Sequence, residues 1–251
     1  MPSHPVPVRL LSLSALLLSL SALALPARAA NVVELFTSHG CSSCPPADAV
    51  LEQLIKEDPD LVALEFHVDY WNDLVHGADG SWVDPFSKRE YTDRQRLYEA
   101  RRLKGRTGVY TPQVVVNGYY ATIGSHGNSI RTALARAKAT ESSIEFEAPA
   151  DTTVGLQASV SNVSDEVADL VAVEFDKKRT TLITAGENRD LEITNHNIVR
   201  SMKTVASLAP GTSQVFKGNQ LTLNKPTDDT GCALLLQLRG SGQILAAENC
   251  R

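Results

Sequence analysis

Two cysteines separated by two serines, Cys41 and Cys44, are the residues whose types and spacing could do chemistry. Such a pair can help bind zinc, form a local structural disulfide, or act as a dithiol–disulfide redox centre. Structural zinc needs four ligands, usually a second Cys-x-x-Cys pair or two histidines. The sequence has no second such pair, and its other cysteines, Cys232 and Cys250, lie far along the chain. Zinc binding by this pair is therefore disfavoured.

The residues around the pair favour redox chemistry. Residues 32–36 (VVELF) are a short apolar run of strand formers. Pro45, Pro46 and the apolar positions in 47–55 predict a helix directly after Cys44. The N-terminus of a helix stabilises a thiolate, so we expect an exposed Cys41 with a lowered thiol pKa. Cys44, one turn deeper, could resolve a mixed disulfide formed on Cys41.

The first half of the chain predicts an α/β layered domain over residues 30–141. Strands are expected at 32–36, 61–68, 114–116 and 119–123, and helices after the cysteines and at 128–139. A helical segment over about 70–106 is inserted between the second and third strands.

The second half, residues 142–251, has a periodicity of two and clusters of turn residues. This pattern predicts a separate antiparallel β-sandwich of about seven or eight strands. With a final hairpin turn centred on Ser241, Cys232 and Cys250 fall opposite each other. We expect them to form a structural disulfide.

The first 29 residues predict a signal peptide. Residues 10–25 contain only Leu, Ser and Ala, with Arg9 in front of them, and Ala27-Arg28-Ala29 supplies small residues for cleavage after Ala29. A membrane anchor is the alternative, but the run is short for a span of about 20 apolar residues. We therefore expect a periplasmic or secreted bacterial protein, free of the membrane after cleavage. The net charge of −5 disfavours binding to nucleic acid.

Several motifs in the first half of the chain also resemble those of a known fold. Residues 31–140 resemble a thioredoxin-like domain in the strand–CSSC–helix unit and in Thr111-Pro112 directly before a strand. This resemblance implies a cis peptide bond at Pro112, with Thr111 and Pro112 packed near the cysteines and positioning a bound polypeptide. Gly124, before the last helix, fits the same pattern.

Longer segments resemble a narrower group, the bacterial secreted proteins of domain-of-unknown-function family 1223. The matching segments are VELFTSHGCSSCPPAD, HVDYWNDL, WVDPFSKREYTDRQRLY, GVYTPQVVVNG and ENRDLEITNHNIVRSM. The resemblance covers nearly the whole chain after the signal peptide. The family has no firmly assigned activity, so the resemblance informs the fold more than the substrate.

Other titratable residues leave alternatives open. Glu34 is offset by one position from the buried acid usual in thioredoxins, and is either a proton relay for Cys44 or a salt-bridged core residue. His39 is interpreted as a solvent-exposed turn residue, with stabilisation of the Cys41 thiolate as the alternative. His67 or His126 could join the two cysteines in a copper site, because thiolates with an imidazole suit copper.

The sequence thus predicts an exported thiol–disulfide oxidoreductase acting on protein or small-molecule thiols and disulfides. Cys41 and Cys44 would be catalytic, and Thr111 and Pro112 would position the substrate. No organic cofactor is expected, and no metal is assigned to the favoured function. A non-catalytic protein that binds copper or a partner is the alternative. The sequence does not indicate the oligomeric state.

Overall fold

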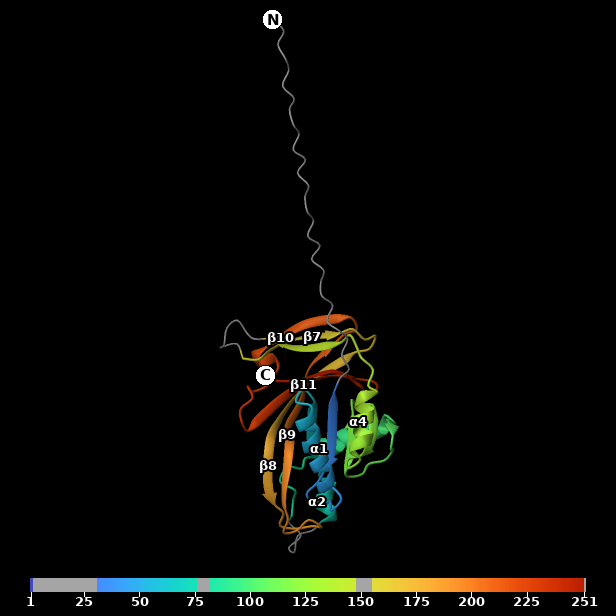
Figure 1. Cartoon of the computed structure of the whole chain (residues 1–251), viewed down its shortest axis with the longest axis vertical. Coiled ribbons are helices and arrows are strands. Elements are labelled where there is room, and N and C mark those ends of the chain that lie inside the picture. The colour runs from blue at the N-terminus through green and yellow to red at the C-terminus, as the bar shows by residue number, and fades with distance from the viewer. Residues whose placement is uncertain (2–30, 76–81, 148–154, 251) are drawn as a thin grey trace.

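The computed structural model describes residues 1, 31–75, 82–147 and 155–250 (Figure 1). Residues 2–29 of the expected signal peptide (1–29) lie outside the described part. None of the described helices combines the length and the apolar character needed to cross a membrane.

The described α-helices all lie in the first half of the chain. Their bounds are α1 Pro45–Glu57, α2 Tyr70–Leu74, α3 Arg89–Ala100 and α4 Gly127–Ala135, with a short 3₁₀ helix, η2, at Gly218–Gln220. The strands up to residue 123 are β1 Val32–Thr37, β2 Val62–His67, β3 Lys104–Gly105, β4 Gln113–Val116 and β5 Tyr120–Ile123. The later strands are β6 Ser143–Glu147, β7 Gln157–Asn162, β8 Ala168–Leu182, β9 Glu192–Leu208, β10 Thr212–Lys217, β11 Thr230–Leu238 and β12 Ile244–Asn249.

A single mixed sheet runs through both halves of the chain. Within the described residues it has nine strands in the order β12-β11-β8-β9-β2-β1-β4-β5-β3. Its centre is the parallel pair β1–β2, where Val32 aligns with Val62 and Thr37 with His67. A second sheet, β10-β7-β6, has three strands in the same described part, and it lies at one end of the molecule (Figure 1).

The predicted fold class, a thioredoxin-like α/β domain followed by a β-sandwich domain, is wrong. Strands β8, β9, β11 and β12 lie beyond the expected boundary but extend the sheet of the first half. The junction is β9 alongside β2, where Glu65 pairs with Ile198 and the Asn197 side chain donates a hydrogen bond to the Ala63 carbonyl. Strand periodicity reports which face of a strand is buried, not which distant strand it pairs with, so the sequence pattern could not reveal this junction.

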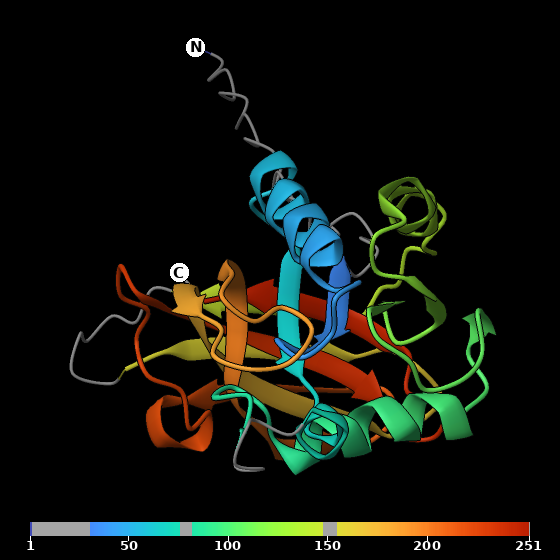
Figure 2. The ribbon, with the colours of Figure 1, turned by 90° about the horizontal axis from the view of Figure 1, so that it is seen from below.

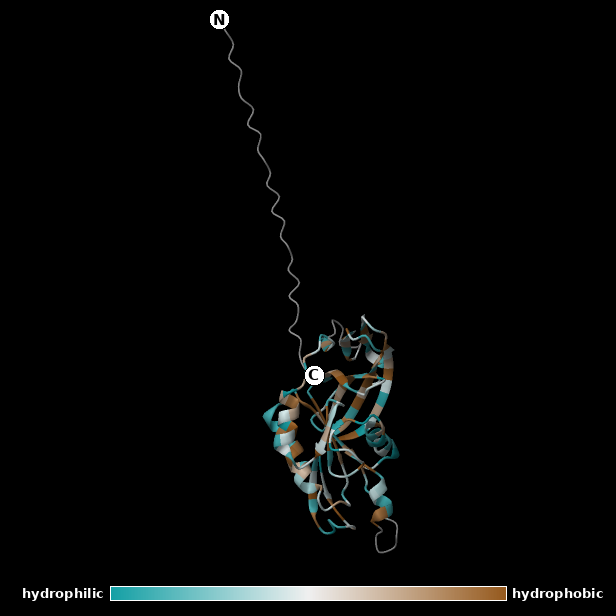
Figure 3. Ribbon diagram, turned by 90° about the vertical axis from the view of Figure 1, so that its right-hand side faces the viewer, coloured by the Kyte–Doolittle hydropathy of each residue, from teal (hydrophilic) through white to brown (hydrophobic). Residues whose placement is uncertain are grey.

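Helices cover both faces of the central strands (Figure 2). Side chains of alternate residues point to opposite faces of a strand. Val33 and Leu35 of β1 therefore pack with α1 and α4 on one face, while Val32 and Phe36 pack with Tyr91 and Tyr98 on the other. The helices alternate between hydrophilic and hydrophobic residues along their length (Figure 3), as expected for helices with one buried side.

The three-stranded sheet packs on the far end of the large sheet. Apolar residues of β6, β7 and β10, such as Ile144, Val160 and Phe216, form one core with Leu170 and Leu234 of β8 and β11. The final hairpin has the predicted register, because Ala233 pairs with Asn249 and the Cys250 N–H donates to the Cys232 carbonyl.

Candidate functional site

The two cysteines lie between the end of β1 and the start of α1. The Cys41 N–H donates to the Ser38 carbonyl, and the Cys44 N–H donates to the Cys41 carbonyl. Cys44 is the residue that immediately precedes α1. The two cysteines form a disulfide, with their Cα atoms 5.4 Å apart. A second disulfide joins Cys232 to Cys250, so both expected pairings are confirmed.

A loop from the second half of the chain covers the Cys41–Cys44 disulfide. This loop, residues 183–191, joins β8 to β9 and is called the β8–β9 loop below. The Asn188 side chain donates hydrogen bonds of 2.9 Å to the carbonyls of both His39 and Cys41. The Glu187 carboxylate accepts a 2.9 Å hydrogen bond from the Ser42 N–H.

The expectation of an exposed Cys41 is therefore wrong. Its relative exposure is 1 %, and that of Cys44 is 0 %. Only Ser42 and Ser43 between them are exposed. The covering loop is more than 140 residues away in sequence, and no local pattern around the cysteines could indicate it.

Thr111 and Pro112 lie close to the cysteine segment, joined by the expected cis peptide bond. The Trp71 indole N–H donates a 2.8 Å hydrogen bond to the Thr111 hydroxyl. A Cβ at Gly124 would meet the side chains of both Ala47 and Pro112 at about 3 Å. Pro112 is thus packed near the first turn of α1, and only a glycine fits between the two segments.

Glu34 is a salt-bridged core residue on the face of the sheet opposite α1. It is fully buried, and its Oε1 accepts a 2.6 Å hydrogen bond from the Arg94 guanidinium of α3. The Tyr98 hydroxyl also donates to it. Its neighbour Leu35 points to the α1 side. The period of two along β1 therefore separates Glu34 from the cysteines, and the proton-relay interpretation does not fit.

A different acid, Asp48, lies one helical turn after Cys44 in α1. Its N–H donates to the Cys44 carbonyl within the first turn of α1, and its carboxyl accepts a 3.0 Å hydrogen bond from the Thr37 hydroxyl. Burial, reinforced by the charge of Glu65, raises the pKa of the Asp48 carboxyl well above its usual range. Sequence reasoning missed this residue, although its position four residues after Cys44 on a helix was available.

The residues around Asp48 continue into a buried polar cluster. His39, Glu65, His67 and Asp84 are each no more than 1 % exposed. The ring nitrogens of His67 contact two carboxylates, Nδ1 with Asp84 Oδ2 at 2.9 Å and Nε2 with Glu65 Oε1 at 3.0 Å. The interpretation of His39 as a solvent-exposed turn residue is wrong, because Asn195 of β9 and the segment around Asp84 enclose it.

Charges within this cluster shift the pKa values of its members. Burial alone would lower the pKa of His67, but the neighbouring Asp84 and Glu65 carboxylates raise it to about 10. Burial opposes ionisation of Asp84, yet the charge and the hydrogen bond of His67 hold the pKa of Asp84 below its usual range. Burial lowers the pKa of His39, and the positive charge of His67 adds to this effect.

The copper ligands considered from the sequence are not assembled in this form of the protein. Both cysteines are in the disulfide, and both ring nitrogens of His67 contact carboxylates. His126 is exposed at the start of α4.

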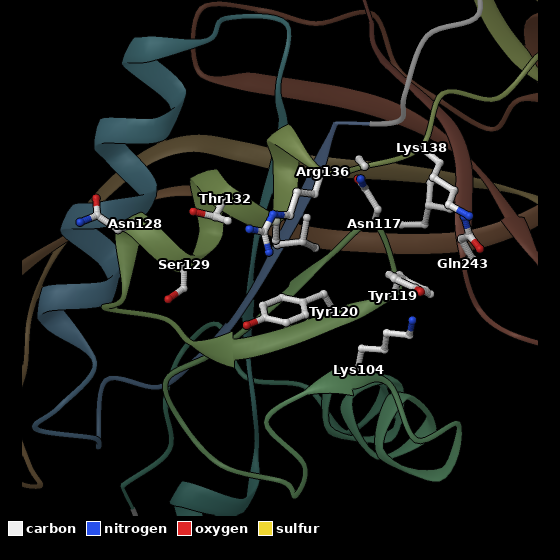
Figure 4. Close-up of a pocket in the computed structure, with 14 residues that line it drawn as sticks. Lys104, Asn117, Tyr119, Tyr120, Asn128, Ser129, Thr132, Arg136, Lys138 and Gln243 are labelled. Atoms are coloured by element: carbon white, nitrogen blue, oxygen red, sulfur yellow. The ribbon is translucent and has the colours of Figure 1, made fainter.

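A cavity of about 650 Å³ lies away from the cysteines (Figure 4). It is bordered by α4, by the turn between β4 and β5, and by Ile244 of β12. Val116 lines it and pairs with Val33 at the beginning of β1, whereas the cysteines follow the end of β1. The cavity therefore belongs to the opposite end of the sheet. Its charged lining residues are Lys104, Arg136 and Lys138.

The fold is similar to that of a solved bacterial protein. The X-ray crystal structure of protein AGR_C_4864 from Agrobacterium tumefaciens has a TM-score of 0.69 and 30% sequence identity, covering 89% of this chain and 95% of that chain. A beta-glucuronidase 2 structure from Bacteroides uniformis covers 42% of this chain and 12% of its own, at 17% identity and a TM-score of 0.18, which carries no argument. No curated protein matches the sequence.

A family model matches most of the chain. Residues 32–237 match the family model described as "Protein of unknown function (DUF1223)". The resemblance noted in the motifs is thereby confirmed at the level of the family, and the chain belongs to the DUF1223 family.

Proposed function

We propose that this protein is an exported thiol–disulfide oxidoreductase whose redox centre is the Cys41–Cys44 disulfide. The observation that carries the proposal is the position of this disulfide, at the N-terminus of α1 and one helical turn before the buried acid Asp48. The two disulfides support an oxidising compartment. Protein or small-molecule thiols and disulfides are the proposed substrates.

A purely structural role explains the first disulfide less well than the second. A disulfide stabilises mainly by restricting the unfolded chain, and its contribution grows with the length of the closed loop. Cys41 and Cys44 are 3 residues apart and Cys232 and Cys250 are 18 apart. By the chain-entropy relation, the shorter loop contributes roughly half as much as the longer one.

The surroundings of Cys41 can stabilise a thiolate after reduction. The 13-residue helix α1 directs the positive end of its dipole toward the cysteines. The Ser43 hydroxyl lies 3.4 Å from the Cys41 sulfur and can donate a hydrogen bond to the thiolate. Stabilising the thiolate makes Cys41 a better leaving group in disulfide exchange.

In the proposed exchange, a substrate thiolate attacks the Cys41 sulfur. A bond forms between the substrate sulfur and Cys41, the Cys41–Cys44 bond breaks, and Cys44 leaves as a thiolate that takes a proton from Asp48. A second substrate thiolate then attacks the substrate sulfur of the mixed disulfide and releases the Cys41 thiolate. The substrate dithiol becomes a disulfide, and the protein is reduced by two electrons. The reverse sequence reduces a substrate disulfide.

Access to Cys41 requires displacement of the β8–β9 loop. The loop is held over the cysteines by the two hydrogen bonds of Asn188 and the one accepted by Glu187. The loop also places Gly186 against Gly40 and Val75 and buries Ile183 and Ala185. It is a short connection outside the strands, so displacing it costs less than unfolding a core strand. Thr111 and Pro112 would then face the incoming backbone of the substrate.

A redox titration tests the proposal with an internal control. The protein is equilibrated in buffers of defined thiol–disulfide ratio, the free thiols are alkylated, and each disulfide is followed by mass spectrometry of its peptides. We expect a potential above about −300 mV for Cys41–Cys44 and below it for Cys232–Cys250, because structural disulfides in exported proteins resist reduction. Equal, strongly negative potentials for both pairs would contradict a redox role.

A further inference from the structure

Three buried side chains bring metal-binding atoms together beneath the cysteine segment. One ligand atom each from His39, His67 and Asp84 lies within 4.8 Å of the others. His39 follows β1 and His67 ends β2, so the cluster lies at the carboxyl ends of two parallel strands. Ligand sites in sheets of this kind commonly occur at that edge. Two imidazoles and a carboxylate are a donor set that first-row divalent cations bind.

The tautomer of His39 is set by its hydrogen bonds. Asn195 donates its amide nitrogen to Glu65 Oε1 at 2.6 Å, so its amide oxygen is the atom that faces His39 Nε2 at 2.8 Å. That oxygen only accepts, and therefore His39 Nε2 carries the proton. In the neutral ring the other nitrogen, Nδ1, is left with a lone pair. It is buried, has no hydrogen-bond partner, and lies 3.6 Å from Asp84 Oδ1.

The orientation of the His67 ring is also set by contacts at both of its nitrogens. Its Nε2 donates to Glu65 Oε1 at 3.0 Å, and its Nδ1 faces Asp84 Oδ2 at 2.9 Å. A proton between His67 Nδ1 and Asp84 satisfies this contact, but leaves the lone pair of His39 Nδ1 facing the other carboxylate oxygen. A cation held between the two imidazoles and the carboxylate would satisfy all three groups. Metal-bound histidines usually donate their second nitrogen to a carboxylate or carbonyl oxygen, which is the arrangement of both rings here.

We propose that the DUF1223 fold of this protein contains a buried site for one first-row divalent cation. The ligands are Nδ1 of His39, Nδ1 of His67 and a carboxylate oxygen of Asp84. Asn195 and Glu65 orient the two imidazoles by accepting hydrogen bonds from their other ring nitrogens, Nε2 of His39 and Nε2 of His67. Around zinc, such ligands lie roughly 3.4 Å apart, so ligand atoms that are now up to 4.8 Å apart need to approach by up to about 1.4 Å when the ion binds.

The charge of the cluster favours a cation. Glu65 and Asp84 are both buried and both contact His67, and their hydrogen bonds come from hydroxyl, amide and imidazole groups. Buried carboxylates are costly unless they are neutralised or paired. One divalent ion would neutralise two of them, whereas one proton on His67 neutralises only one.

Complete burial makes metal uptake part of folding. His67 is 0 % and His39 1 % exposed, so an ion enters while the chain folds or when the segments over the site open. Metal binding of this kind stabilises the folded state directly. This site does not use Cys41 or Cys44. Evidence against the metal site would therefore leave the proposed redox function untouched, and the reverse also holds.

Refolding the oxidised full chain in the presence of zinc tests the site. The protein is unfolded in guanidinium with a chelator, refolded with and without zinc sulfate, desalted, and its metal content is measured. We expect one zinc per chain and a higher Tm in the zinc-refolded protein. His39→Gln should lose the zinc, and Asn195→Ala should weaken binding about 10- to 100-fold. His126→Gln, which changes an exposed histidine, is the matched control and should keep it.

A measurement on the wild-type protein tests the site even if the variants fail to fold. Refolding with cobalt should give visible ligand-field bands without the near-ultraviolet charge-transfer band of a thiolate ligand. No metal uptake by the wild type, retention of zinc by a folded His39→Gln variant, or a thiolate charge-transfer band would each overturn the proposal.

Discussion

The Asn188 side chain binds the Cys41 backbone from 147 positions away in the sequence. Its amide nitrogen donates to the Cys41 carbonyl and to the His39 carbonyl, each at 2.9 Å. Asn188 is itself 3 % exposed. The β8–β9 loop therefore fixes the backbone of the segment that carries Cys41, which is 1 % exposed.

Releasing this loop should expose the disulfide. We expect Asn188→Ala to speed the reduction of Cys41–Cys44 by dithiothreitol about tenfold, because about 1.4 kcal/mol of lost hydrogen bonding is a factor of ten in the open population. The rate is followed by quenching with an alkylating reagent. Arg189→Ala, an exposed neighbour in the same loop, is the control. An unchanged rate in Asn188→Ala would mean that the loop does not limit access.

Asp48 should make the protein less stable as the pH rises. Because its pKa is raised in the folded state, Asp48 keeps a proton there that the unfolded chain loses above its value of 3.8. Its contribution to stability is complete below that value and is lost as the pH rises through the folded pKa. We expect Asp48→Asn to be more stable than the wild type at pH 8, with the difference vanishing near pH 4.

Denaturant titrations across this pH range measure the effect of Asp48. The exposed acid Asp93 supplies the control variant, Asp93→Asn. A stability difference between wild type and Asp48→Asn that does not change with pH would contradict the raised pKa. Asp48→Asn should also slow thiol exchange, since Cys44 then lacks its proton donor.

Glu34 should matter for stability and not for redox chemistry. Glu34→Gln leaves the Arg94 guanidinium, whose side chain is 7 % exposed, without its charged partner. Breaking a buried ion pair in this way costs about 3 kcal/mol. Urea unfolding measures this loss, with the exposed Glu90→Gln as control. If Glu34→Gln instead slowed thiol exchange without loss of stability, the proton-relay role would be restored.

The second disulfide should be structural. Replacing both Cys232 and Cys250 by serine removes a constraint that closes a loop between residues 18 apart. We expect a loss of about 3 kcal/mol in the free energy of unfolding, with the potential of Cys41–Cys44 unchanged. A potential that shifts with this replacement would indicate that the two disulfides are coupled.

Local sequence patterns predicted the individual elements near the cysteines well. The strand at 32–37, the proline-initiated helix α1 and the turn register of the final hairpin each depend on residues close in sequence. The Cys41–Cys44 and Cys232–Cys250 pairings followed from the same short-range reasoning.

The assembly of these elements was not predictable in the same way. The pairing of Glu65 with Ile198 joins the two halves into one sheet, and Asn188 and Asn195 come from the second half to the site. Each of these contacts joins residues that are 130 or more positions apart. Hydrophobic periodicity carries no information about such partners, which is why a separate β domain and an exposed Cys41 were expected.

Trapping of a mixed disulfide tests the central claim most directly. In Cys44→Ser, Cys41 keeps its place before α1 but has no partner to resolve a mixed disulfide. Exported in bacterial cells and quenched with acid, this variant should accumulate covalent adducts that reductant releases, and Cys41→Ser should not. Redox exchange through Cys41 predicts these adducts. Their absence from Cys44→Ser, with the variant folded and exported, would contradict it.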